Sequence, residues 1–510
     1  MSSDASTLPL RDTADGRRTG GRVWCSPAAA LARFSATQWL ALASLAAIVV
    51  GCALIVVIAA DRPSILSPTT HANYFPGWMA GPAGGLWPGL TRNTTMLRCL
   101  FSGSIVVMFV AYLAAVAHAP KLPARFTVAA LVAAHAVIFL APPLALTDIF
   151  NYVNYGRMEV VHHLNPYTTI PILEPHDDPS YALSNWHQLL SPYGPLFTLF
   201  TFVFVPLGVP ASFWVLKGLL ALSSLAMLGL VWRCAKLLGR DPIAAVALVG
   251  LNPIVLVWGL GGDHNDPLTL LVIMLGFYLL LRSRDVALEE ATALKAPWLG
   301  GLSPRLVGAG VAFVTAAAMK ASAGVLLPVV LASLIRAPKR LVQVLLGMVM
   351  AAIAVGAASL IAFGLHIPDL STQARLVTNV SVPNLIGLAI GSGGATETLH
   401  VVLSAVLLAL VIACCVQAWR QGSAITASGW ASVALLVTLS WVLPWYVLWV
   451  LPLAALSCSR RLRVATVALG VYLIIAWAPA SALLWDALHF HPEKTSLGRL
   501  HQRYVKELLN

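Results

Sequence analysis

The stretch LVAAHAVIFLAPPLALTDIFNYVNYGR, residues 131–157, joins an apolar run to a polar segment rich in aromatic residues. The apolar run covers 125–146, the polar segment covers 147–195, and a further apolar run follows. Asp148 is a lone acidic residue at the end of the first run, so the pattern predicts a membrane helix with a charged group at its mouth. We therefore expect 147–195 to form an ordered loop at the membrane surface, held in place by the rest of the chain.

The composition places the chain among membrane proteins that cross the bilayer many times. Of its 510 residues, 59% are hydrophobic and only 10% are charged, whereas soluble domains carry about 25% charged residues. The mean hydropathy is +0.82. The net charge of +12 comes from basic residues spread over short loops. Such residues fix membrane orientation, so no nucleic-acid partner is expected, and the seven cysteines form no paired framework.

The apolar runs predict an all-α polytopic protein of about 12–14 transmembrane helices without a soluble domain. Residues 1–35 are expected to be a disordered cytoplasmic tail, 36–485 the membrane domain, and 486–510 a polar C-terminal tail. The first run, Trp39–Ala60, is long enough to cross and lacks a clear cleavage site, so it predicts an uncleaved anchor with the N-terminus inside the cell.

The orientation of the loops follows from the basic residues, which favour the cytoplasmic side. This rule puts Asp148 outside and 233–240 inside, yet two apolar runs lie between them. Either 193–209 is a half-membrane or re-entrant segment, or the rule fails at 233–240. Pro195, Pro206 and Pro210 bracket the run and favour the re-entrant interpretation. Further basic markers that we place inside are Arg282, Arg336, Lys339, Arg340, Arg420, Arg460 and Arg461.

The polar segment contains the first group of residues suited to chemistry. If 148–163 is a short interfacial helix, Tyr152 and Tyr155 share a face with Asp148 at i+4 and i+7. Asp148 at the start of a helix is equally suited to capping it. The neighbouring tyrosines favour a sugar-binding site, and Arg157 suits a phosphate because its planar fork binds in a bidentate manner.

A second polar group, GGDHNDP at 261–267, interrupts the apolar runs beyond the loop. Asp266 followed by Pro267 is typical of a helix-capping turn. The alternative is an acidic site that acts together with Asp148. No cofactor is required by the sequence, but a metal site at Asp148 and Asp266 stays open, since carboxylate oxygens suit Mg²⁺ or Mn²⁺.

Two lysines lie within apolar sequence. Lys320 either extends its ammonium to the membrane surface or neutralises a lipid phosphate on the same side as the acidic loops. Lys217 lies only a few residues inside its run, so we expect its side chain to extend to the surface.

Aromatic and histidine residues leave further alternatives. Trp445 and Tyr446 follow a helix-breaking proline and suit either a membrane-interface belt or stacking on a sugar or prenyl chain. The polar segment also contains several histidines and acidic residues, among them His162, Asp178 and His187. Because no two of its histidines are four residues apart, we favour a solvated loop over a metal site.

Taken together, these residues resemble a known pattern. They are, in chain order, Asp148, Phe150, Tyr152, 155–157 (YGR), 165–167 (NPY), 193–195 (YGP), 252–253 (NP), 262–266 (GDHND), Lys320 and 444–446 (PWY). The series resembles the bacterial polyprenol-phosphate-mannose-dependent α-1,6-mannosyltransferases, which are multi-spanning glycosyltransferases of the C-type fold.

The resemblance implies transfer of a sugar, expected to be mannose, from a polyprenyl-phosphate carrier to a lipid or glycan acceptor at the outer face of the cell membrane. Asp148 matches the base or acceptor-orienting group, and Asp266 matches a second acidic position. Arg157 and Lys320 would neutralise the donor phosphate. The residues expected to contact the sugar or the acceptor are Tyr152, Tyr155, Asn165, Tyr167, Tyr193, His264, Asn265, Trp445 and Tyr446.

The alternative function is a transporter or flippase for a lipid-linked or polar solute. Such proteins often contain inverted repeats and helices broken at the membrane midplane. The sequence has no clear repeat between its halves and no nucleotide-binding motif. Its acidic residues cluster at loop depth, which favours chemistry at the membrane surface over transport. We therefore expect a glycosyltransferase with Asp148 as the base. One base in a single displacement inverts the anomeric centre, so the enzyme is expected to be inverting.

Overall fold

A computed structural model describes residues 34–60, 76–87, 93–144, 148–292 and 302–509. The predicted N-terminal tail, 1–35, falls outside the described residues except for its last two positions. Thr147, with which the predicted loop begins, also lies outside them. The described residues form helices and no strand, which confirms the all-α prediction.

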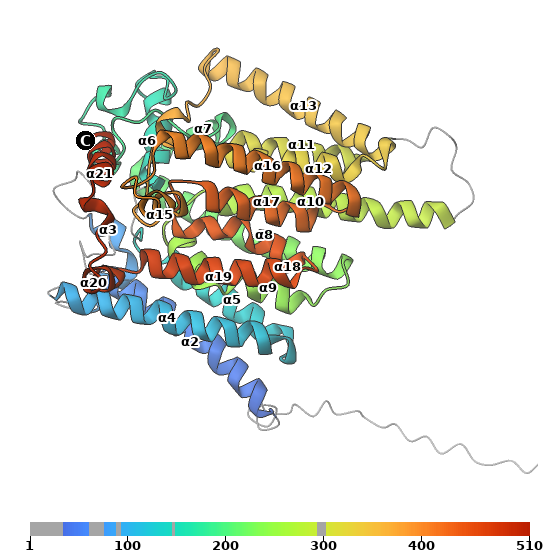
Figure 1. Ribbon diagram of the computed structural model, residues 1–510, viewed down its shortest axis with the longest axis horizontal. Helices are drawn as coiled ribbons and strands as arrows, with labels where there is room; N and C mark the ends of the chain where they lie inside the picture. Colours follow the sequence, from blue (N-terminus) through green and yellow to red (C-terminus); the bar gives the residue numbers. More distant parts are fainter. Residues whose placement is uncertain (1–33, 61–75, 88–92, 145–147, 293–301, 510) are drawn as a thin grey trace, which may run out of the picture.

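Among the described residues, six segments are long and apolar enough to cross a membrane. Five are built on the single helices α2 (Ala36–Ala60), α4 (Thr94–His118), α10 (Asp266–Thr292), α13 (Pro338–Phe363) and α16 (Glu397–Gln421). The sixth combines α7 (Pro195–Phe202), the short 3-10 helix η6 (Val205–Leu207) and α8 (Gly208–Leu237). These helices lie side by side along one direction and form a bundle (Figure 1), which confirms a polytopic membrane protein.

Two bent pairs raise the count of candidate spans to eight. They are α9 (Pro242–Gly250) with the π-helix η7 (Ile254–Leu260), and α19 (Arg460–Trp477) with α20 (Ser481–Ala487). The predicted count of 12–14 is reached only if shorter apolar helices cross as well. These are α5 (Ala124–Phe139), α11 (Pro304–Met319), η8 (Ala321–Val325) with α12 (Leu326–Leu334), α17 (Ala424–Thr438), and η9 (Pro444–Trp449) with α18 (Leu451–Leu456).

The polar segment after the third apolar run folds around a helix, α6 (Asp148–Val160). Although α6 is polar in sequence, most of its residues are buried, because it lies in a second hydrophobic core with α7 and α8. Within this core the ring of Phe150 stacks on that of Phe213, with centroids 5.5 Å apart. Parallel ring contacts of this kind stabilise the core beyond their buried area, and they fix α6 at one end of the bundle.

The run 193–209 begins with α7, which has eight residues. At 1.5 Å per residue it is only about 12 Å long, so this helix is too short to cross the membrane by itself. A close approach explains the position of α7. The N–H of Gly194 donates to the carbonyl of Met319 at 3.1 Å, and a side chain at Gly194 would collide with the carbonyl of Ala318. Glycine thus brings the loop beside Lys320.

Short helices cover the end of the bundle that carries α6 (Figure 1). They include α3 (Gly77–Ala80), η4 (Pro171–Leu173), η5 (Tyr181–Leu183), α14 (Ser371–Ala374), α15 (Val382–Ala389) and η10 (Pro492–Lys494). The predicted polar tail, 486–510, is helical at this end, where α21 (Ser496–Leu509) follows η10. Its Leu508 carbonyl accepts a hydrogen bond from the Gln188 N–H at 3.1 Å, so the C-terminus lies against the polar loop.

Candidate active site

Asp148, the first residue of α6, faces a histidine from the second polar group. Its Oδ2 lies 3.0 Å from Nδ1 of His264. The imidazole is buried and stacks on the indole of Trp445, with centroids 3.5 Å apart, whereas the Asp148 side chain is 18% exposed. A carboxylate that is oriented by a fixed imidazole and still accessible is arranged to take up a proton from a bound hydroxyl.

Asp266 and Lys320 form an ion pair beside this carboxylate. The Lys320 ammonium lies 2.8 Å from both Asp266 oxygens, and the indole N–H of Trp449 donates to Oδ1 at 2.6 Å. Asp266 is fully buried, whereas the Lys320 side chain is 22% exposed. Lys320 follows the last residue of α11 and has extended backbone angles, so the helix break turns its ammonium toward the site.

This geometry does not fit the metal site that the sequence left open. Both oxygens of Asp266 are engaged by an ammonium, and a second cation placed there would be repelled by it. Within the described ranges, no group of three or more His, Cys, Asp and Glu residues could hold a metal ion.

Asn265 connects the two acidic groups. Its backbone N–H donates to the hydroxyl of Tyr152 at 3.2 Å, and its Oδ1 lies 3.4 Å from the Lys320 ammonium. Burial, with the charges of Asp148 and Asp266, raises the pKa of Tyr152 well above its usual value. The Tyr152 hydroxyl therefore stays protonated.

A buried ion pair that the sequence analysis missed holds the same loop. Lys217 of α8 is buried, and its ammonium lies 3.0 Å from a carboxylate oxygen of Asp263. The expectation that Lys217 extends to the membrane surface is therefore wrong, because its partner lies inside the protein. The lone lysine in an apolar helix was a signal that a buried partner was needed. The partner, Asp263, lies 46 residues away, so no local pattern identifies it.

Tyr155 and Tyr167 form hydrogen bonds within the polar loop, and Asn165 joins the loop to the bundle, whereas the ring of Tyr193 packs against that of Tyr152 with centroids 4.8 Å apart. The hydroxyl of Tyr155 donates to the carbonyl of Leu189 at 2.8 Å. That of Tyr167 donates to the carbonyl of Tyr193 at 2.9 Å. Asn165 donates to the carbonyl of Phe363, at the end of α13, at 2.8 Å. These contacts fix the shape of the loop, and none of them joins Asp148 or Lys320.

Tyr446 lies beside Lys320, whose ammonium is 5.7 Å from the centre of the tyrosine ring. Its neighbour Trp445 supports His264. Both aromatic residues thus lie beside the polar groups of the site, and their contact with a sugar or acceptor stays a prediction.

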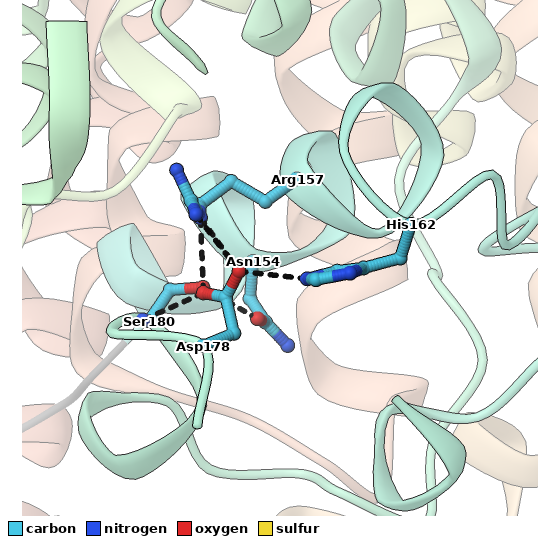
Figure 2. A network of polar contacts seen from close by, with 5 residues as sticks. All are labelled: Asn154, Arg157, His162, Asp178 and Ser180. Carbon is cyan, nitrogen blue, oxygen red and sulfur yellow. Dashed lines mark hydrogen bonds and ion pairs between the residues drawn. The ribbon is translucent and has the colours of Figure 1, made fainter. Parts of the chain in front are cut away.

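Arg157 lies in a separate network, shown in Figure 2. Its Nε and Nη2 donate to both oxygens of Asp178 at 2.8–3.0 Å, and Nε2 of His162 lies 2.8 Å from Oδ2. Ser180 donates from its hydroxyl to Oδ1 at 2.7 Å. The structure therefore does not bring Arg157 to the same carboxylate as Lys320.

Asp178 is buried, so the prediction of a solvated loop is wrong at this position. Burial alone would raise the pKa of Asp178, but hydrogen bonds from Arg157, Ser180 and His162 together lower it well below the usual range. Nearby, burial raises the pKa of Glu174 to about 8, while Asn154 and Arg157 oppose the shift and Asp178 adds to it. This network could not be predicted from a local pattern, because Arg157 and Asp178 are 21 residues apart.

Comparison with known proteins gives an independent indication of function. Residues 49–336 match a family described as alpha-(1->6)-mannopyranosyltransferase, N-terminal domain, and residues 377–490 match the MptB C-terminal domain. The chain is 28% identical to alpha-(1->6)-mannopyranosyltransferase A of Mycobacterium tuberculosis, over 69% of this chain and 71% of that enzyme. It is 28% identical to alpha-(1->6)-mannopyranosyltransferase B of Corynebacterium glutamicum, over 64% and 58%. No solved structure matches the chain.

Proposed function

Because the chain belongs to the alpha-(1->6)-mannopyranosyltransferase family, we propose that it moves mannose from a polyprenyl-phosphate carrier to a hydroxyl of a lipid or glycan acceptor. Family membership makes the chain a membrane mannosyltransferase and sets aside the transporter alternative. The carrier, the acceptor and the side of the membrane are the parts that we infer.

One observation supports the assignment of roles. Three aspartates converge on the loop 261–266, and two of them, Asp263 and Asp266, are buried and paired with lysines. Asp148 instead faces His264 and is partly exposed. A base must come within hydrogen-bond reach of the proton that it removes, so Asp148, the exposed carboxylate among the three, suits proton removal from the acceptor hydroxyl.

An apolar cavity beside Lys320 supports a prenyl-phosphate donor. It has a volume of about 380 Å³ and is lined by Leu196, Leu199, Phe200, Leu268 and Met319. Met319 directly precedes Lys320, and Leu268 is the second residue after Asp266. A prenyl chain in this cavity would bring its phosphate to an ammonium that is partly exposed, which matches an amphipathic lipid with one anionic end.

In the proposed reaction the acceptor hydroxyl attacks the anomeric carbon of the sugar. Asp148 takes the hydroxyl proton, the new glycosidic bond forms, and the bond between the anomeric carbon and the phosphate oxygen breaks. The leaving prenyl phosphate keeps the electron pair, and Lys320 stabilises the charge that develops on it. A single displacement of this kind inverts the configuration, so a β-linked donor gives an α-mannoside.

We place this site at the outer face of the cell membrane, with the N-terminus inside. The polar loop contacts the last residue of α13, because Asn165 donates a hydrogen bond to the Phe363 carbonyl. Lys339 and Arg340 lie at the beginning of α13, which is its other end. Likewise α19 begins with Arg460 and leads toward the end that carries the site. Basic residues favour the cytoplasmic side, so this distribution supports an outward-facing site.

The test uses the purified full-length chain in lipid nanodiscs with an acceptor extract. Transfer is compared for prenyl-phosphate mannose, prenyl-phosphate glucose and GDP-mannose, with and without EDTA. We expect transfer from prenyl-phosphate mannose and a loss of about 10²–10⁴-fold in D148N. The matched control is D177N, an exposed aspartate of the same loop, which should retain activity. Transfer from GDP-mannose alone, or normal transfer by D148N, would overturn the proposal.

A further inference from the structure

The C-terminal helix α21 lies across the end of the bundle that carries the site (Figure 1). The chain turns there, since α20 is bent by 77° from the direction of α19. Two hydrogen bonds fix α21 in place. The Gln188 N–H donates to the Leu508 carbonyl at 3.1 Å, and the Tyr504 hydroxyl donates to the Thr372 carbonyl at 3.3 Å. A helix that runs across the spans at the end of a membrane bundle lies in the plane of the interface.

The two faces of α21 differ in chemistry. Leu508 is buried, and Leu497, Tyr504 and Val505 are partly buried. The opposite face exposes Arg499, Arg503 and Lys506, which share it because they are spaced at i, i+4 and i+7. In the part of the chain that the structure describes, no salt bridge joins these three residues to a carboxylate.

We propose that α21 rests on the membrane surface and that Arg499, Arg503 and Lys506 bind the phosphates of anionic phospholipids. The argument is one of charge and position, since a basic helix face at the level of the headgroups is attracted to anionic lipids. Leu500 adds an apolar contact, because it is 55% exposed on the same helix and suits the boundary between headgroups and acyl chains.

Headgroup binding would also restrain the loop of the active site. The residue that follows Gln188 is Leu189, and its carbonyl accepts the hydrogen bond from the Tyr155 hydroxyl on α6. A short path thus leads from the lipid surface through α21 to the helix that begins with Asp148.

The test measures hydrogen exchange of the full-length protein, without donor or acceptor, in nanodiscs of phosphatidylglycerol or of phosphatidylcholine. We expect slower exchange of the α21 amides in phosphatidylglycerol. Each basic side chain is expected to contribute about fivefold to headgroup affinity. The variant R499Q/R503Q should therefore lose most of the difference between the two lipids, and R499K/R503K should keep it. High salt should reduce the difference in the parent protein, since the Debye length falls to about 3 Å at 1 M.

The matched control is R460Q/R461Q, which removes two exposed arginines from the beginning of α19, at the other end of the bundle. This variant should keep the lipid dependence of α21. Equal exchange of α21 in both lipids would overturn the proposal, and so would an R499Q/R503Q variant that keeps the full difference. The measurement involves no sugar transfer, so its outcome is separate from that of the proposed reaction.

Discussion

Replacing Lys320 by methionine tests whether its ammonium serves the fold, the reaction or both. Methionine keeps an unbranched side chain of similar length and removes the charge. Asp266 is fully buried, and both of its oxygens lie 2.8 Å from the ammonium. Breaking a buried ion pair by removing one partner destabilises a protein by about 3–5 kcal/mol. K320M alone should therefore unfold at a markedly lower temperature than the parent.

The double variant K320M/D266N separates the two roles. The amide oxygen of asparagine can still accept the hydrogen bond that the Trp449 indole gives to Asp266 at 2.6 Å. Neutralising both partners removes the uncompensated buried charge, so most of the lost stability should return. Transfer should remain impaired by about 10²–10³-fold, the usual effect of removing one group that stabilises transition-state charge.

The assay pairs thermal unfolding in detergent with single-turnover transfer from prenyl-phosphate mannose. Stability should be regained in the double variant while the transfer rate is not. If K320M/D266N were no more stable than K320M, the ion pair would not be the source of the destabilisation. If the folded double variant transferred sugar at the parent rate, Lys320 would have no part in the reaction.

Two further predictions concern the network around Asp178. The folded state raises the pKa of Glu174 to about 8. The stability of E174Q relative to the parent should therefore be nearly unchanged at pH 4.5 and should rise toward pH 8, by up to about 5 kcal/mol. Between pH 4.5 and 8 the unfolded parent binds fewer protons than the folded parent, so the parent loses stability as pH rises. A stability gain in E174Q that did not depend on pH would contradict the raised pKa of Glu174. R157M and D178N should both increase proteolysis of the polar loop if Arg157 acts through its pair with Asp178. A higher donor KM in R157M alone would instead restore the phosphate-binding role that the sequence suggested.

The sequence was sufficient to predict the membrane class and four of the residues that meet at the site. Hydropathy identified the apolar runs, because burial in lipid requires long apolar helices. Asp148, His264, Asp266 and Lys320 stood out because charged and polar groups are rare in such a chain. Each interrupted an apolar context, which is a signal that can be read locally.

The pairings could not be predicted in the same way. Lys217 with Asp263 and Arg157 with Asp178 are set by how helices cross and loops fold back, and no periodicity relates residues 46 or 21 positions apart. For this reason the sequence pattern predicted Arg157 as a cation free to bind phosphate. The count of spans was also hard to predict, because an apolar helix of 10–17 residues has the composition of a span without its length.

The loop 261–266 explains why this site needs such a specific stretch of sequence. Its four polar residues face partners on three different helices or helix ends: Asp263 meets Lys217 of α8, His264 and Asn265 meet α6, and Asp266 meets Lys320. Consecutive side chains can diverge in this way only on a tightly folded backbone. Asp263 accordingly has a φ of 57°, an unusual conformation for a residue other than glycine.

Two glycines make that backbone conformation feasible. A side chain at Gly261 would meet the Val257 carbonyl, and one at Gly262 would meet the carbonyl of Trp258 and the ring of His264. The loop therefore lies directly on the π-helix η7, with no space for a larger residue. Substituting either glycine would displace the imidazole from Asp148 and the carboxylate of Asp266 from Lys320 together. The proposed base and the proposed phosphate-neutralising cation are thus positioned by one backbone turn, so a change in that turn would affect both halves of the proposed reaction at once.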